Sequence, residues 1–288
     1  MIISNTDLQR AYAMIREMYR DKDIVPGTLR KIGFRNKWNY VLAEHDQSGL
    51  AFNFTGDHAV YGEVDDLEQF INLQLYIGKN LFEFVEYLLL KPELQMRSLC
   101  LAALNALSHP LTSSSSLKER GIPVSEEESY DFIKSEDIVT VIGYGGIVNQ
   151  MYGRCQELHV NDMRPKHALL TLTVGEKIEY GPEKIIFHSA EENAEVLAKS
   201  DVVLMSGCTI VNGTFRELIS KAKKARIIGM YGPSAQIVPD FLLSYGINYI
   251  SSRRIINHSG IVDQLMNAMD LGGAFKADMK AYYVYLRR

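Results

Sequence analysis

The strongest chemical signal in this sequence is a polar stretch at residues 201–214, which reads Asp-Val-Val-Leu-Met-Ser-Gly-Cys-Thr-Ile-Val-Asn-Gly-Thr. Its apolar beginning predicts a buried strand, and the apolar spacing at residues 215–219 predicts an amphipathic helix. Hydroxyls, an amide and free N–H groups at the start of a helix favour a carboxylate, a phosphate or a hydroxyl. Helix capping uses only one such side chain, and this loop has several, so the loop as a whole indicates a ligand site. Its members are Ser206, Gly207, Thr209, Asn212 and Thr214.

A glycine-rich turn after the apolar run 138–142 is the second candidate site, because glycines let backbone N–H groups approach an anion or a ribose. Asp162 lies 19 positions after Gly143 and ends the next apolar run, where a dinucleotide or adenosyl site has its ribose-binding acid. The match to G-x-G-x-x-G is partial, because Val148 replaces the third glycine. A tight turn with a solvated carboxylate is the alternative. The turn contains Gly143, Tyr144, Gly145 and Gly146.

The third candidate is the turn Gly232-Pro233-Ser234, which follows the apolar run 226–230. By itself it is an ordinary turn. The carboxyl ends of parallel strands share one edge of an open α/β sheet, and ligands bind outside that edge. Three polar turns, each after a predicted strand, therefore predict one shared ligand-binding rim.

Metal and thiol chemistry have weaker support in the sequence. Cys208 could act as a thiolate nucleophile, but no histidine is near it in sequence, so a small buried cysteine is the favoured interpretation. The chain has no HExxH motif or close histidine pair. His159, Asp162, His167 and His188 lie near predicted strand ends, where hydrogen-bonded or surface side chains are favoured over metal ligands.

The spacing of apolar residues predicts the elements that position these turns. Helical spacing at residues 8–19 and 66–109 and alternation at 28–54 predict helices packed on one face of a small antiparallel meander. Short apolar runs alternating with helical segments follow, as in a doubly wound parallel sheet. The serine-rich and acidic stretch before residue 131 predicts a linker. We therefore expect an α+β domain at 1–112, a linker at 113–130 and a mostly parallel three-layer α/β domain at 131–288.

Composition limits the classes of protein to consider. The 288 residues carry a net charge of −4 without a block of Lys or Arg, so nucleic acid is not an expected partner. No signal peptide or apolar span is apparent, so neither export nor a membrane is expected. The three cysteines form no Cys-x-x-Cys spacing, which fits a reducing cytoplasm. The aromatic tail at 282–285 suits a sheet edge or a second copy of the chain, so a homodimer is one option.

The order of these motifs resembles the DUF364 family of heavy-metal chelation proteins. The resemblance covers nearly the whole chain: the first half, with residues 99–107, resembles the companion DUF4213 domain. It rests on the run Ser-Gly-x-Thr-x-Val-Asn-Gly-Thr at 206–214, Gly232-Pro-Ser, Gly272-Gly273, Ile142-Gly-Tyr and Gln156-Glu-Leu. It implies an enolase N-terminal-like domain joined to a Rossmann-like domain with a site at their junction. The site residues that it implies are Gly143, Glu157, Asp162, Ser206, Thr209, Asn212, Thr214 and Ser234.

Two hypotheses for function follow, and a third contrasts with both. The first is a protein that binds a small anionic or metal-chelating molecule between the two domains, with a divalent metal as one option for the cofactor. The second is an enzyme that uses S-adenosylmethionine or a nucleotide, held by the glycine turn and Asp162. Such an enzyme would act by positioning, since no catalytic triad is apparent. The third, a purely structural interaction protein, predicts that Asn212→Ala changes no small-molecule affinity.

Overall fold

The computed structural model describes residues 3–33, 37–55, 61, 67–164, 171–174, 177–180, 185–267 and 277–287. Of the predicted features, His167 and Gly272-Gly273 lie outside these residues. Within the described ranges, no helix has the length and apolar character that crossing a bilayer requires.

The first half contains the predicted antiparallel meander, covered by helices. Strands β1, β2 and β3 pair in that order, with Trp38 opposite Phe52 and Tyr40 opposite Leu50. Helix α4 packs on β3 so closely that a Cβ atom at Gly49 would lie 2.3 Å from the Ala102 carbonyl oxygen. The elements are α1 (Thr6–Asp21), β1 (Leu29–Gly33), β2 (Trp38–Ala43), β3 (Ser48–Phe52), α2 (Leu67–Gln74), α3 (Leu81–Leu89), α4 (Leu94–Ser108) and η2 (His109–Thr112).

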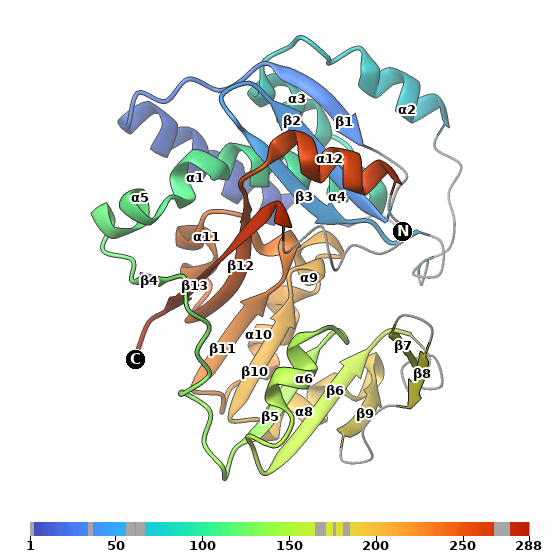
Figure 1. Cartoon of the computed structure of the whole chain (residues 1–288), viewed down its shortest axis with the longest axis vertical. Coiled ribbons are helices and arrows are strands. Elements are labelled where there is room, and N and C mark those ends of the chain that lie inside the picture. Colours follow the sequence, from blue (N-terminus) through green and yellow to red (C-terminus); the bar gives the residue numbers. More distant parts are fainter. Residues whose placement is uncertain are drawn as a thin grey trace.

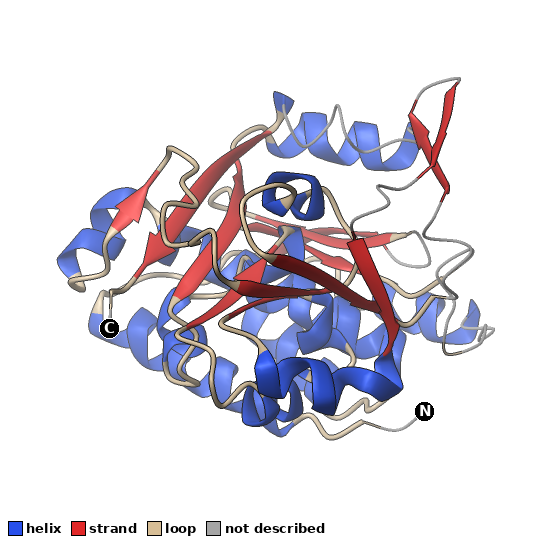
Figure 2. Ribbon diagram, turned by 90° about the horizontal axis from the view of Figure 1, so that it is seen from below, coloured by secondary structure: helices blue, strands red, loops and turns tan. Residues whose placement is uncertain are grey.

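The second half is built around a large, mostly parallel sheet with helices on both sides (Figure 2). Its strands are β4 (Val124–Ser125), β5 (Ile138–Ile142), β6 (Glu157–Asp162), β9 (Ile185–Ser189), β10 (Val202–Ser206), β11 (Ile227–Tyr231), β12 (Tyr249–Ile255) and β13 (Met279–Tyr285), while β7 (Thr171–Val174) and β8 (Lys177–Tyr180) pair separately. Its helices are α5 (Ser114–Glu119), α6 (Ile147–Met151), η3 (Ala190–Glu192), α8 (Asn193–Lys199), α9 (Cys208–Val211), α10 (Phe215–Lys221), η4 (Pro233–Ala235), α11 (Pro239–Leu243) and α12 (His258–Asn267). This arrangement confirms the predicted α/β class.

The order of the parallel strands defines where a ligand is expected. Across the sheet they lie in the order β12-β11-β10-β5-β6-β9, and β13 and β4 continue it antiparallel. When these six strands are numbered 1 to 6 along the chain and read across the sheet from β9 to β12, their order is 3-2-1-4-5-6. Doubly wound dinucleotide-binding sheets have the same order. The order reverses between β5 and β10. Ligands bind at such a switch point, outside the carboxyl ends of the strands.

The apolar core continues from one half of the chain to the other. One cluster of buried side chains includes Leu101 and Ala103 of α4 together with Ile210 and Val211 of α9. A second cluster covers the opposite face of the large sheet, with Val141 of β5 among its members. Figure 1 shows the first half lying over the carboxyl ends of β10 and β11. The residues predicted as a linker include α5 and β4, and the boundaries at 112 and 131 stay a prediction.

Candidate functional site

The three polar turns singled out in the sequence meet at the carboxyl ends of the parallel strands. Gly143 has a φ of +89°, and a Cβ atom there would lie 3.1 Å from Cβ of Ser206. A Cβ atom at Gly207 would lie 2.6 Å from the backbone nitrogen of Ala235, next to Ser234. We call the loops that follow β5, β6, β10 and β11 the carboxyl edge. These close approaches explain why glycine occupies positions 143 and 207, because a side chain at either position would displace the facing loop.

Asp162, at the end of β6, is the most heavily bonded carboxylate of the carboxyl edge. Its Oδ2 accepts hydrogen bonds from Tyr144 N at 2.6 Å and Arg164 Nη2 at 2.8 Å. Its Oδ1 accepts bonds from Arg164 N at 2.9 Å and Arg164 Nε at 3.0 Å. Burial alone would raise the pKa of Asp162, but the bonds and the charge of Arg164 and the Tyr144 N–H hold it below its usual value. Asp162 is therefore an ionised side chain with about four acceptor positions, all in use.

Arg164 is the cation that the described residues place at the carboxyl edge, and the sequence analysis did not single it out. Besides its paired bonds to Asp162, its Nη2 also donates to the Tyr144 carbonyl at 3.1 Å. Its side chain keeps 25% of its surface exposed, and its Nη1 makes no hydrogen bond among the described residues. The paired bonds fix the plane of the guanidinium. Among the described residues, nothing occupies the Nη1 N–H pair of this fixed cation, so an anion could accept from it.

Tyr144, Tyr231 and Cys208 surround this ion pair. The Tyr144 hydroxyl is buried and has no hydrogen-bond partner among the described residues, and it lies in the field of Arg164. The Tyr231 hydroxyl has one hydrogen, which it donates to the Gly143 carbonyl, with Ile142 O at 3.3 Å as a weaker second acceptor. Burial raises the pKa of Tyr231 well above its usual value. Burial also raises the pKa of the Cys208 thiol. Cys208 is partly exposed, but a raised pKa disfavours the thiolate form that a nucleophile needs.

The polar side chains of the loop after β10 bond mainly within the loop. Ser206 Oγ accepts from Cys208 N at 3.3 Å, and Thr209 Oγ1 donates to Ser206 O at 2.8 Å. Asn212 Oδ1 accepts from Thr214 N at 3.2 Å and from Thr214 Oγ1 at 2.7 Å. These bonds stabilise the loop, so the hydroxyls have fewer directions left for a ligand than the sequence pattern suggests.

The first half of the chain contributes to the same region. Ser234 Oγ accepts a hydrogen bond from Phe52 N at 2.9 Å, and Asn212 Nδ2 donates to the Tyr61 hydroxyl at 2.8 Å. In the turn after β11, Gly232 has a φ of +95° and Pro233 begins η4. The junction between the two halves therefore lies at the carboxyl edge.

One predicted site residue, Glu157, lies elsewhere. It begins β6, where it is level with Ile138 at the start of β5. Asp162 ends the same strand, so the two carboxylates are separated by about 16 Å of extended chain. Glu157 Oε2 instead accepts from His159 Nε2 at 2.9 Å. Among the other predicted residues, Gly145 lies beside the Tyr231 ring and Gly146 is the residue before α6.

The donor set of the carboxyl edge does not fit a directly bound metal ion. No group of three or more His, Cys, Asp and Glu side chains able to hold a metal occurs in the part of the chain that the structure describes. The Asp162 oxygens are engaged by N–H donors, and the nearby Arg164 would repel a cation. As far as the described residues of this edge go, a metal fits there as part of an anionic chelate.

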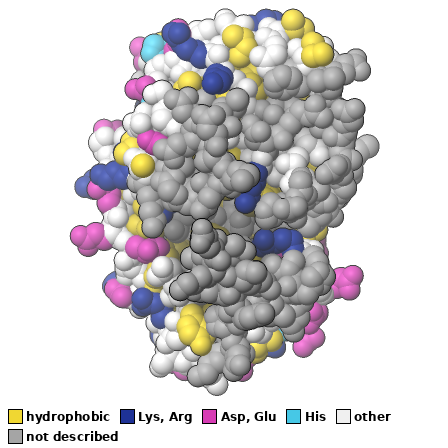
Figure 3. All heavy atoms as spheres, turned by 45° about the vertical axis from the view of Figure 1, so that its right-hand side comes forward, with side chains coloured by type: hydrophobic (Ala, Val, Ile, Leu, Met, Phe, Trp, Pro, Cys, Tyr) yellow, Lys and Arg dark blue, Asp and Glu magenta, His cyan; other side chains and the backbone are white. Residues whose placement is uncertain are grey.

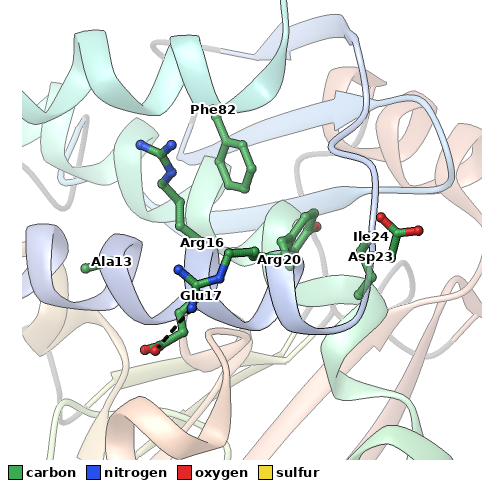
Figure 4. A pocket seen from close by; sticks show the side chains of 8 residues that line it. Ala13, Arg16, Glu17, Arg20, Asp23, Ile24 and Phe82 are labelled. Carbon is green, nitrogen blue, oxygen red and sulfur yellow. Dashed lines mark hydrogen bonds and ion pairs between the residues drawn. The ribbon is translucent and has the colours of Figure 1, made fainter.

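The surface outside the carboxyl edge offers less specific features. A pocket of about 730 Å³ lies along α1, lined by the charged side chains of Arg16, Glu17, Arg20 and Asp23 (Figure 4). It contains none of the predicted site residues, and Arg20 is paired with Glu17 at 3.5 Å. On the face in Figure 3, the described basic and acidic side chains are interspersed, so they form no single basic patch there.

The described structure and the sequence are similar to those of known proteins. Residues 129–284 match the model of the DUF364 family and residues 22–108 that of the DUF4213 family, both described as "Putative heavy-metal chelation". The "Uncharacterized protein MJ0500" of Methanocaldococcus jannaschii is 23% identical over 258 residues, which cover 86% of this chain and 85% of that protein.

Two solved structures have the same fold. A DUF364 protein of unknown function from Pyrococcus horikoshii is 19% identical, with a TM-score of 0.70 over 97% of this chain and 100% of that one. A DUF364 protein of unknown function from Desulfitobacterium hafniense is 16% identical, with a TM-score of 0.67 over 96% and 99%.

Proposed function

The chain belongs to the DUF364 family, and from this premise we propose that it binds a small anionic ligand, free or as a metal chelate, at the carboxyl edge of its large sheet. The observation that carries the proposal is the Arg164 guanidinium, held in place by Asp162 with Nη1 unbonded among the described residues. A fixed, half-buried guanidinium suits a carboxylate or phosphate better than a mobile surface cation does.

Two further features support an anion at this position. The loops around Gly143 and Ser206 meet at the switch point of the sheet, where ligands of doubly wound folds bind. The positive charge of Arg164 acts on the Tyr144 hydroxyl, which is buried and has no hydrogen-bond partner in the described part of the chain. A buried hydroxyl without a partner is costly, and a bound oxygen atom would satisfy it. Cation, hydroxyl and backbone turn would then contact one ligand.

Equilibrium titration tests this proposal, with citrate, phosphate and citrate with one equivalent of Ni²⁺ as probes. Arg164→Gln removes the charge and should weaken binding of the recognised anion about 10- to 100-fold, the effect of losing one charged hydrogen bond. Arg154→Gln is the control, because Arg154 is an exposed arginine bonded to Gln150 O. Equal affinity of the Arg164 variant and the parent chain for every bound probe, or no binding at all, would refute the proposal.

An enzyme that uses S-adenosylmethionine or a nucleotide is the second candidate, favoured by the strand order and by the position of Asp162 at the end of the second parallel strand. A ribose there would have to compete with Arg164 for Asp162. Native mass spectrometry and elemental analysis of the purified chain would separate the candidates, by detecting an adenosyl compound or a metal chelate. Titration of Asp162→Ala with adenosyl and nicotinamide ligands then tests whether that carboxylate binds a ribose.

A further inference from the structure

Two histidines connect the two halves of the chain. His109 of η2 and His258 of α12 have ring centroids 5.2 Å apart, in an edge-to-face arrangement. Each ring also bonds across the junction: His109 Nε2 lies 2.9 Å from Ile255 O of β12, and His258 Nδ1 lies 2.5 Å from Ser48 Oγ of β3. The two side chains therefore join the hairpin of β2 and β3 to the second half, and we call them the histidine bridge.

A small apolar cluster accompanies the histidine bridge at this junction. It contains Trp38, Tyr40 and Leu50 from β2 and β3, together with Ile255, Ile261, Leu265 and Met279 from β12, α12 and β13. Figure 1 shows α12 lying over β2 and β3. The buried members of this cluster are separate from the two larger clusters that form most of the described core. Because stability is not uniform across a fold, α12 can separate from the hairpin here while the larger clusters stay intact.

The hydrogen bonds of the histidine bridge suit two neutral rings, each with a single N–H group. A carbonyl oxygen only accepts, so His109 Nε2 carries the proton that is donated to Ile255 O, and Nδ1 carries a lone pair. In His258 the proton is best placed on Nε2, which lies 3.8 Å from Asp46 Oδ1, so Nδ1 accepts from the Ser48 hydroxyl. A further proton on His258 Nδ1 would force this hydroxyl to turn away.

The surroundings of the histidine bridge oppose an added positive charge. The charged and titratable groups that the described residues place around it are Asp46 in the turn between β2 and β3, Arg253 and Arg254 of β12, and Asp278 and Tyr282 at β13. Asp46 attracts a protonated ring, but its side chain is 79% exposed and therefore screened by water. Burial, the other ring and Arg254 lower the pKa of His109 to about 4, and burial also lowers the pKa of His258. Protons therefore bind more tightly to separated rings than to rings in contact.

From this geometry we infer that the histidine bridge is an acid-sensitive latch, in which protons added to His109 and His258 release α12 from β2 and β3 while the rest of the fold stays in place. Two rings in contact that both gain a positive charge repel each other, so the two protonation steps act in the same direction. The contact contributes its full stability above pH about 6.5 and loses it as the pH falls toward 4. The latch does not depend on the anion site proposed at Arg164.

The fluorescence of Trp38 tests the latch, because Trp38 is the single tryptophan of the chain and lies in the cluster that would open. Between pH about 6.5 and 4 its emission should shift to longer wavelength while the far-UV circular dichroism stays unchanged. The double variant His109→Gln/His258→Gln should keep the emission constant over this range, since glutamine does not titrate. His188→Gln is the matched control and should keep the parent transition: the His188 side chain is 13% exposed and bonds to a second histidine, His159, at the other end of the sheet.

A second variant tests the sign of the effect without changing either ring. Asp46 raises the pKa of both histidines, and its φ of +56° is a conformation that asparagine also adopts. Asp46→Asn should therefore leave Trp38 emission unchanged at neutral pH and move the transition to higher pH by a few tenths of a unit, even if the double variant does not fold. The inference is overturned if Trp38 emission changes only together with the circular dichroism, if the double variant keeps the parent transition, or if Asp46→Asn moves the transition to lower pH or not at all.

Discussion

Replacement of Arg97 should destabilise the chain more than replacement of any exposed arginine. Arg97 lies in the first turn of α4, and its side chain is fully buried. Its guanidinium donates to Val211 O at 2.8 Å and Ile210 O at 2.9 Å in α9, and its Nη1 donates to Ser4 O and Asn5 Oδ1, both at 2.6 Å. It therefore joins the N-terminal segment, α4 and the loop that follows β10.

The expected magnitude follows from these contacts. Arg97→Ala removes a buried cation, leaves four acceptors without their donor and opens a cavity. Removal of one partner of a buried charged network costs about 3–5 kcal/mol of unfolding free energy. With an unfolding entropy of about 2 cal/mol/K per residue, the melting temperature of this 288-residue chain should fall by about 5–8 °C. Arg97→Lys keeps the charge but not the planar fork, so its loss should be intermediate.

Thermal unfolding followed by circular dichroism measures the change, and urea unfolding gives the free energy independently. Arg16→Ala is the control, because Arg16 is 57% exposed and its pair with Glu86 at 3.2 Å is a surface ion pair. Such pairs contribute about 0–1 kcal/mol. A melting temperature of Arg97→Ala within about 2 °C of the parent would refute the reasoning, because it would mean that the carbonyls find other donors at little cost.

Three further predictions concern packing, pH and thiol reactivity. Gly49→Ala should lower the free energy of unfolding, measured by urea unfolding, by about 3 kcal/mol, because the added Cβ atom would collide with the backbone of α4. Gly146→Ala is the control and should leave the free energy of unfolding unchanged, because a Cβ atom there has open space. Burial lowers the pKa of His109 to about 4, so its contribution to stability is present above pH about 6.5 and is lost as the pH falls toward 4. His109→Gln should flatten that part of the stability profile. Cys208 should react with iodoacetamide at neutral pH much more slowly in the folded chain than in urea, and fast labelling would restore the nucleophile hypothesis.

The apolar pattern predicted most of the fold for a physical reason. Strands covered on both faces need consecutive apolar residues, and the runs at 138–142 and 202–205 are such strands, β5 and β10. The resemblance to DUF364 and DUF4213 is also confirmed by the family models. The apolar pattern did not predict β7 and β8. It also could not predict the order of the strands in the sheet, because that order depends on how the crossover connections pack.

The candidate site was only partly predictable because a sequence shows the type of a polar group but not its partner. Spacing placed Asp162 correctly at a strand end next to the glycine turn. It could not show that Arg164, two residues later, takes up its oxygens. The hydroxyls of Thr209 and Thr214 suggested ligand donors, yet they bond within their own loop. The sequence signal for this ion pair is a basic residue two positions after the acid, Arg164 after Asp162.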